Sequence, residues 1–152
     1  MTVTDPAGGA ATTPGGEGVS PGEFLDTNPV VRYLVRDDPD LAARATALIE
    51  SERRLLLSVV TVAEIGFVLA STYRIERALV VDALIDLLNR ENIDTVEVPT
   101  EVAIQALRFC RPSGRVNFAD AMLWSVARSK APARVWTFDR RFPEDGIERR
   151  AP

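Results

Sequence analysis

Short apolar runs of strand length alternate with longer amphipathic segments of helix length from residue 23 onward, and this alternation restricts the fold more than any other feature of the chain. Residues 55–59 (Leu-Leu-Leu-Ser-Val) have the continuous apolar character of a buried strand. Strands that alternate with helices predict an α/β fold with a mostly parallel sheet and right-handed crossover connections. The predicted strands are residues 23–26, 55–59, 95–98 and 134–138, with a weak last strand near Ile147. The predicted helices are residues 29–35, 37–52, 61–72, 75–89, 100–111 and 117–129.

The first 22 residues differ from the rest of the chain. They hold six of its nine glycines and three of its ten prolines, with almost nothing to bury. Such a composition predicts a disordered Gly/Pro-rich tail over residues 1–22. The folded domain is expected over residues 23–152, the length of one ordinary domain.

The composition excludes several kinds of catalytic site. The chain contains no histidine, which removes Ser-His-Asp and Cys-His catalysis and histidine-ligated zinc, and its single cysteine removes a Cys-cluster zinc site. No apolar run approaches the roughly 18 residues of a membrane span, and no secretory signal is recognisable. We therefore expect a cytoplasmic protein without membrane contact, whose chemistry depends on carboxylates, hydroxyls or an oxygen-bound metal.

Four acidic residues stand where the ends of parallel strands and the starts of the following helices meet. Asp26 and Asp139 directly follow predicted strands, while Glu64 and Asp120 lie in the first turns of predicted helices. In open α/β sheets the functional crevice lies beyond the carboxyl ends of the strands. The four carboxylates are therefore predicted to converge there.

Several carboxylates in one cleft repel one another unless a cation neutralises them. Hard divalent cations such as Mg²⁺ or Mn²⁺ prefer oxygen ligands and can activate water without any histidine. The four acids are thus predicted to be both catalytic residues and metal ligands.

Each acid also has a local structural explanation. Glu64 stands three residues after Thr61, and Asp120 three residues after Asn117, which is the spacing of a helix capping box. Asp26 can cap a helix, and Asp139 can close a turn. The joint placement of the four favours a cluster over four unrelated caps.

Three polar residues beside these acids are candidates for a supporting role. Thr27 and Thr137 flank Asp26 and Asp139, and their hydroxyls can orient a water or a phosphate, or bond the local backbone instead. Asn28 is a helix cap or a further site residue.

The C-terminal third is rich in arginine, although the net charge of the whole chain is −4. Arg140 and Arg141, beside Asp139, are the candidates for phosphate contact, and a solvated surface without a ligand is the alternative. Trp124 and Trp136 are expected in the core rather than as platforms for stacking bases.

Four segments together resemble one known family. Residues 24–34, 61–65, 118–121 and 137–142 resemble, in order and spacing, the motifs of the PIN-domain family, and specifically those of the VapC-type ribonuclease toxins of bacterial toxin–antitoxin pairs. The resemblance extends over about residues 23–147, which is essentially the whole predicted domain.

The resemblance implies a three-layer sandwich whose central five-stranded parallel sheet, in strand order 3-2-1-4-5, is flanked by helices. It also implies Mg²⁺- or Mn²⁺-dependent endonucleolytic cleavage of RNA, a homodimer, and inhibition by a small cognate antitoxin protein. Asp26, Glu64, Asp120 and Asp139 match the acidic positions of the family. Many relatives carry a further acid where this chain has Asn117, which can still support the site by hydrogen bonding.

Other functions compatible with the sequence are a non-toxin PIN-domain nuclease of RNA processing and a catalytically silent α/β binding module. Phosphoryl transfer through an aspartyl-phosphate at Asp26 is disfavoured, because position 28 is Asn and Lys130 is the only lysine.

Overall fold

The computed structural model describes residues 21–112 and 115–152. Strands and helices alternate through these residues as the sequence predicts, and both sheets are parallel. Most of the predicted tail, residues 1–20, lies outside the described residues. Within the described part of the chain, no helix has the length and apolar character needed to span a bilayer.

The first sheet joins three short parallel strands in the order β1-β2-β3. The central strand β2 (Leu55–Leu57) pairs with β1 (Glu23–Phe24) on one side and with β3 (Ile93–Thr95) on the other. Leu55 and Leu57 are buried, as expected of a strand between two others. The N–H of Leu25 donates to the carbonyl of Leu56 at 2.9 Å, so the pairing continues to the residue before Asp26.

The second sheet consists of β4 (Arg134–Trp136) and β5 (Glu148–Arg150). Among the described residues the strands thus form sheets of three and two, and the single five-stranded sheet in the order 3-2-1-4-5 is not confirmed. The neighbours β3-β2-β1 and β4-β5 agree with that order, but β1 and β4 are not paired. The two residues of β1 pair with β2, while β4 pairs with β5 and contacts α6.

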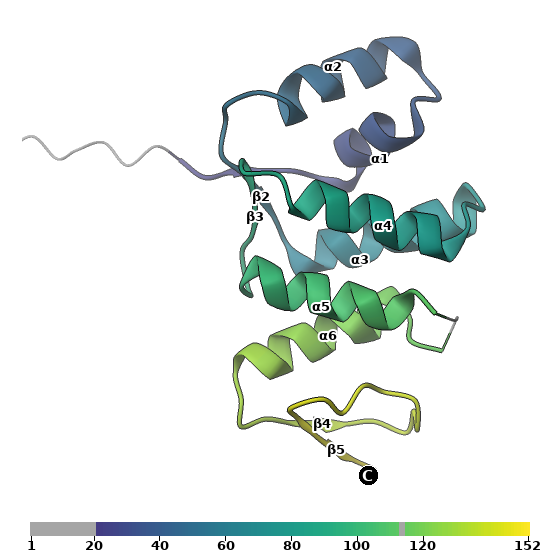
Figure 1. Cartoon of the computed structure of the whole chain (residues 1–152), viewed down its shortest axis with the longest axis vertical. Helices are drawn as coiled ribbons and strands as arrows, with labels where there is room; N and C mark the ends of the chain where they lie inside the picture. The colour runs from purple at the N-terminus through teal and green to yellow at the C-terminus, as the bar shows by residue number, and fades with distance from the viewer. Residues whose placement is uncertain (1–20, 113–114) are drawn as a thin grey trace, which may run out of the picture.

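Among the described residues, six α-helices follow one another down the long axis of the molecule, from α2 at one end to α6, beyond which β4 and β5 lie (Figure 1). Neighbouring helices pack against one another in the pairs α1–α2, α3–α6, α4–α5 and α5–α6. A short π-helix, η1 (Val68–Thr72), continues α3. The helices are α1 (Thr27–Val35), α2 (Pro39–Ile49), α3 (Val59–Phe67), α4 (Arg77–Leu88), α5 (Thr100–Cys110) and α6 (Phe118–Ser129).

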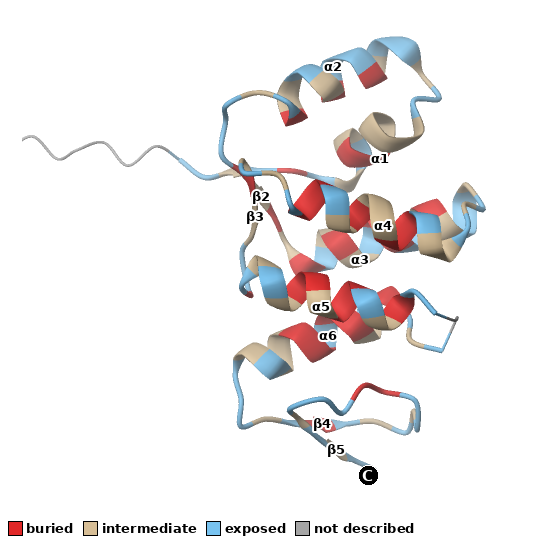
Figure 2. Cartoon of the chain, in the orientation of Figure 1, coloured by how far each residue is buried: buried red, intermediate tan, exposed pale blue. Residues whose placement is uncertain are grey.

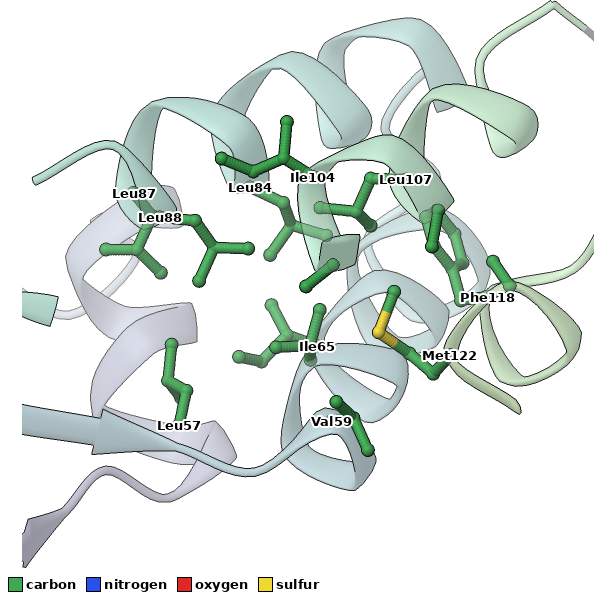
Figure 3. Close-up of a cluster of buried hydrophobic side chains, with 14 of the residues drawn as sticks. Leu57, Val59, Ile65, Leu84, Leu87, Leu88, Ile104, Leu107, Phe118 and Met122 are labelled. Atoms are coloured by element: carbon green, nitrogen blue, oxygen red, sulfur yellow. The ribbon is translucent and has the colours of Figure 1, made fainter. Parts of the chain in front are cut away.

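The helices enclose one apolar core, and the exposed residues lie on their outer sides (Figure 2). Figure 3 shows part of this core, where Ile65, Leu107 and Met122 lie among side chains from several helices. Trp124 is fully buried, and its indole N–H donates to the carbonyl of Asp145 at 3.0 Å. The core therefore holds α6 between α5, α3 and the C-terminal segment.

Gly66 sets how closely α3 approaches α6. A Cβ at this position would lie 2.5 Å from the ring of Phe118, so only glycine fits without a shift. Glu64 precedes Gly66 by two residues, and Asp120 follows Phe118 by two. The close contact therefore places the helix segments that carry these two acids side by side.

Candidate functional site

Asp26 stands between the end of β1 and the start of α1. It occupies the N-cap position of α1, yet its side chain accepts no capping hydrogen bond. The residue is exposed. The expectation that this carboxylate caps the helix is therefore wrong, although Asp26 occupies the cap position.

Glu64 lies well inside α3 and is held from another helix. The hydroxyl Oγ1 of Thr27 donates to its Oε2 at 2.6 Å, across 37 residues of sequence. The capping-box explanation with Thr61 is wrong, because α3 begins earlier and its N-cap is Ser58, whose Oγ accepts from the N–H of Val60 at 3.2 Å. The segment that carries Asp26 and the helix that carries Glu64 thus meet through Thr27.

Asp120 has the local partner that the sequence predicts. Asn117 caps α6 by accepting from the Asp120 N–H at 2.7 Å, and its Nδ2 donates to Asp120 Oδ2 at 2.7 Å. Burial raises the pKa of the Asp120 carboxyl, the negative charge of Asp139 raises it further, and the Asn117 hydrogen bond opposes both. Asp120 and Asp139, 19 residues apart in the chain, are therefore electrostatic neighbours.

Asp139 closes a turn, as its structural explanation predicts. Its Oδ1 accepts from the backbone N–H of Arg141 at 2.8 Å, and the Arg141 Nε lies 3.5 Å away. The backbone bond, with the Arg141 side chain and the charge of Arg149, holds the pKa of the Asp139 carboxyl below its ordinary value. Its own N–H donates to Thr137 Oγ1 at 3.0 Å, so Thr137 supports the turn. Arg140 is exposed.

A cavity of 620 Å³ lies between α3 and α6. Glu64 and Phe67 line it from α3, Arg77 from α4, and Asn117 from the start of α6. The guanidinium of Arg77 lies 5.1 Å from the centre of the Phe118 ring and donates to the carbonyl of Val116 at 3.2 Å. Glu64 and Asn117, which hydrogen-bonds to Asp120, therefore line the same cavity.

The donor set suits a hard divalent cation, because it consists of carboxylate, hydroxyl and amide oxygens. The raised pKa of Asp120 beside Asp139 is an electrostatic strain that a cation would relieve. Within residues 21–112 and 115–152, however, no three carboxylate or cysteine side chains form a group that could hold a metal ion. Thr27 joins the segment of Asp26 to Glu64, and Asp139 acts electrostatically on Asp120, but the four acids are not gathered. Their assignment as metal ligands stays a prediction.

Glu97 is an acidic residue that sequence reasoning missed. It follows β3, and its carboxylate accepts from Ser58 Oγ at 2.6 Å and from the Val59 N–H at 2.9 Å. Desolvation acts to raise the pKa of Glu97, but these hydrogen bonds outweigh it and the net shift is downward. The strand predicted over residues 95–98 includes Glu97, whereas β3 ends at Thr95, so the rule that singles out acids after strand ends did not reach it. Both its oxygens hold the start of α3, so it is a support for that helix.

The two tryptophans have opposite environments. Trp124 is buried, as predicted. The expectation that Trp136 lies in the core is wrong: it is 65% exposed, because Val135 is the residue of β4 that faces inward. Leu79 of α4 is another large apolar residue that is exposed.

A family model described as "PIN domain" matches residues 24–146. A search of curated proteins returned no match. The matched span covers most of the chain and includes the positions from Asp26 to Asp139 described above. The chain therefore belongs to the PIN domain family, whose members are generally metal-dependent nucleases acting on RNA.

Proposed function

We propose that this chain is a Mg²⁺- or Mn²⁺-dependent endoribonuclease and the toxin of a type II toxin–antitoxin pair. Asp26, Glu64 and Asp120 are the principal metal ligands in this proposal, and Asp139 is a closing ligand or orients the attacking water. These residues would hold the cation, which would neutralise their negative charge and supply an activated water for hydrolysis of an RNA phosphodiester bond.

One observation carries the proposal: two of the four carboxylates have no local structural role. Asp26 stands at a helix cap without capping it, and Glu64 accepts a hydrogen bond from Thr27 on another helix. An exposed carboxylate that does not cap the following helix, at the carboxyl end of a parallel strand, is the arrangement expected of a ligand-binding edge.

The polar neighbours hold the acids in position. Thr27 fixes one oxygen of Glu64, and Asn117 fixes one oxygen of Asp120, which leaves the other oxygen of each carboxylate for a cation. Asn28 is exposed beside Asp26 and remains a candidate support. Arg141 contacts Asp139, and with Arg140 it is a candidate for phosphate contact.

The partners proposed are RNA, a small antitoxin protein and a second copy of the chain. Val60, Glu64 and Phe67 fall on one face of α3 by helical spacing, and all three are exposed. Exposed apolar side chains around Glu64, a candidate metal ligand, are typical of a surface that a protein partner covers.

Light scattering of the purified chain should give twice the monomer mass, and a monomer mass would contradict the homodimer.

The test of the enzymatic proposal is cleavage of RNA by the purified chain with and without metal. We expect cleavage with Mg²⁺ or Mn²⁺ and none in excess EDTA. Asp26→Asn should lose more activity than the roughly 10- to 100-fold typical of losing a group that merely orients a metal ligand. Asp40→Asn, an exposed acid in the first turn of α2, is the matched control and should cleave like the wild type.

Full activity of Asp26→Asn, or activity that persists in EDTA, contradicts this mechanism.

Induced expression of the chain in bacterial cells separates a toxin from a non-toxin nuclease. Growth arrest that Asp26→Asn abolishes supports the toxin, and RNA cleavage without growth arrest supports a processing enzyme.

The absence of a gathered metal group among the described residues favours one alternative, a catalytically silent binding module. A calorimetric titration with Mn²⁺ separates the two functions. Binding that Asp26→Asn weakens supports the nuclease, and no binding supports the silent module.

A further inference from the structure

Arg77, the first residue of α4, contacts the start of α6 across 39 positions of the sequence. Its Nη1 donates to the carbonyl of Val116 at 3.2 Å, and its guanidinium carbon Cζ lies 5.1 Å from the centre of the Phe118 ring. A guanidinium within about 6 Å of an aromatic ring is attracted to the face of that ring. Arg77 therefore holds the two residues that stand on either side of Asn117.

Asn117 connects this segment to one of the candidate metal ligands. Its Oδ1 accepts from the Asp120 N–H, and its Nδ2 donates to Asp120 Oδ2, both at 2.7 Å. Asn117 itself is exposed, so core packing of its own side chain does not fix it. The direction in which Asn117 holds the Asp120 carboxylate therefore depends on what holds the residues beside Asn117.

The ring of Phe118 is held from a second helix as well. The residue is only 4% exposed and belongs to the core (Figure 3). From α3, Gly66 approaches the ring so closely that a Cβ at that position would lie 2.5 Å from it. The start of α6 is thus packed against α3 at Gly66 and bonded to α4 at Arg77, and these two helices together determine where Asn117 stands.

The contacts of Arg77 leave the acids of the site charged. One partner of its guanidinium is a backbone carbonyl and the other is an aromatic ring, and neither is a carboxylate. Arg77 nevertheless lines the 620 Å³ cavity between α3 and α6 together with Glu64 and Asn117. Groups that orient a metal ligand from outside the coordination shell act in this way, because they fix the ligand without competing for its charge.

We propose that Arg77 is a positioning residue for the metal site: it fixes residues 116–118, so that Asn117 holds the carboxylate of Asp120 toward the cation. The inference rests on the proposed nuclease function and deepens it by adding a residue that touches neither the cation nor the RNA. Arg77 acts through Asn117, and its effect is therefore on the affinity for the metal.

Calorimetric titration of the full chain with Mn²⁺ tests the inference without any cleavage. Arg77→Met keeps the length of the side chain and removes both contacts, whereas Arg77→Lys keeps a positively charged donor for the carbonyl and the ring. Arg108→Met, at an exposed arginine in the last turn of α5, is the matched control. Circular dichroism and urea unfolding check that each variant is folded.

We expect the Kd for Mn²⁺ to rise about tenfold for Arg77→Met, the lower end of the range for groups that orient metal ligands. Arg77→Lys should recover most of the affinity, and Arg108→Met should bind like the wild type. Unchanged affinity of Arg77→Met overturns the inference, and so does a loss that Arg77→Lys does not restore.

Asn117→Ala supplies a readout that a purely structural role of Arg77 would not move. If Arg77 acts through Asn117, Arg77→Met should weaken Mn²⁺ binding much less in the Asn117→Ala background than in the wild type, because the two losses are then one loss. Fully additive losses overturn the inference. If Arg77→Met does not fold, Arg77→Gln, which keeps an amide donor but no charge, takes its place in the same cycle and the same outcomes decide.

The two proposals fail in distinguishable ways. If the wild type itself binds no Mn²⁺, the nuclease proposal falls, and the inference that rests on it falls with it. If the wild type binds Mn²⁺ and cleaves RNA while Arg77→Met binds the ion equally well, only the inference on Arg77 falls.

Discussion

The hydroxyl of Thr27 determines the environment of one carboxylate in the candidate site. It donates to Glu64 Oε2 at 2.6 Å. Hydrogen bonds to ionised carboxylates are short and comparatively strong. Thr27 therefore connects the end of β1, where Asp26 stands, to the helix that carries Glu64.

Replacing Thr27 with valine tests this role at the scale of one atom. Thr27→Val keeps the shape of the side chain and removes the hydroxyl, so Glu64 loses its fixed orientation. We expect metal-dependent cleavage to fall by roughly 10- to 100-fold, as for groups that orient metal ligands. The measurement is the cleavage rate as a function of Mn²⁺ concentration, with circular dichroism as the check on folding.

Thr27→Ser is the control, because it restores a hydroxyl at the same position. It should recover most of the activity that Thr27→Val loses. Equal activity of the valine and serine variants would show that the hydrogen bond does not position Glu64.

Helix α3 is the element on which the candidate site depends most. Ser58 caps it, Glu97 holds Ser58 and the Val59 N–H, and Gly66 allows its close contact with α6. The sequence analysis places Ser58 in a strand and takes Thr61 as the cap, whereas the observed cap is Ser58, whose hydroxyl donates to Glu97, far along the chain. This is why the start of α3 could not be read from its own sequence.

Glu97→Gln tests this support through its dependence on pH. The pKa of Glu97 is lowered in the folded chain, so its contribution to stability is present above the unfolded value, about 4.3, and is lost as the pH falls through the folded value. We expect a loss of about 1 kcal/mol in the free energy of unfolding at neutral pH, typical of a lost helix cap. Urea unfolding measures it.

The difference between Glu97→Gln and the wild type should shrink as the pH is lowered toward about 3, since the wild-type carboxyl is then protonated. Glu91→Gln, an exposed acid before β3, is the control and should show no such dependence. A pH-independent difference for Glu97→Gln would mean that its charge does not support α3.

At the scale of the whole molecule, periodicity and strand length predicted the order of the elements and most of their bounds. The helix predicted over residues 100–111 is observed as Thr100–Cys110, and the buried run after Arg54 forms the central strand. These features are local, and local patterns suffice for them. The assignment of Asp26, Glu64, Asp120 and Asp139 to one site stays a prediction. The local partners expected from the sequence are confirmed for Asp120 and Asp139, and the expected caps are wrong for Asp26 and Glu64.

Sheet order and side-chain exposure at the sheet edge were less predictable. The strands have only two or three residues each, so few ladder bonds determine which edges meet. Trp136 was expected in the core because large aromatic residues are usually buried. Its exposure follows from the orientation of β4 toward α6, which is decided by tertiary packing.

The central claim is that four carboxylates, distant in sequence, share a divalent cation. The most direct measurement is the crystal structure of the chain soaked in Mn²⁺, with the metal located by its anomalous scattering. We expect density bound by Asp26, Glu64 and Asp120, with Asp139 beside it. Mn²⁺ bound elsewhere, with these carboxylates still apart and engaged only with their protein partners, would contradict the claim.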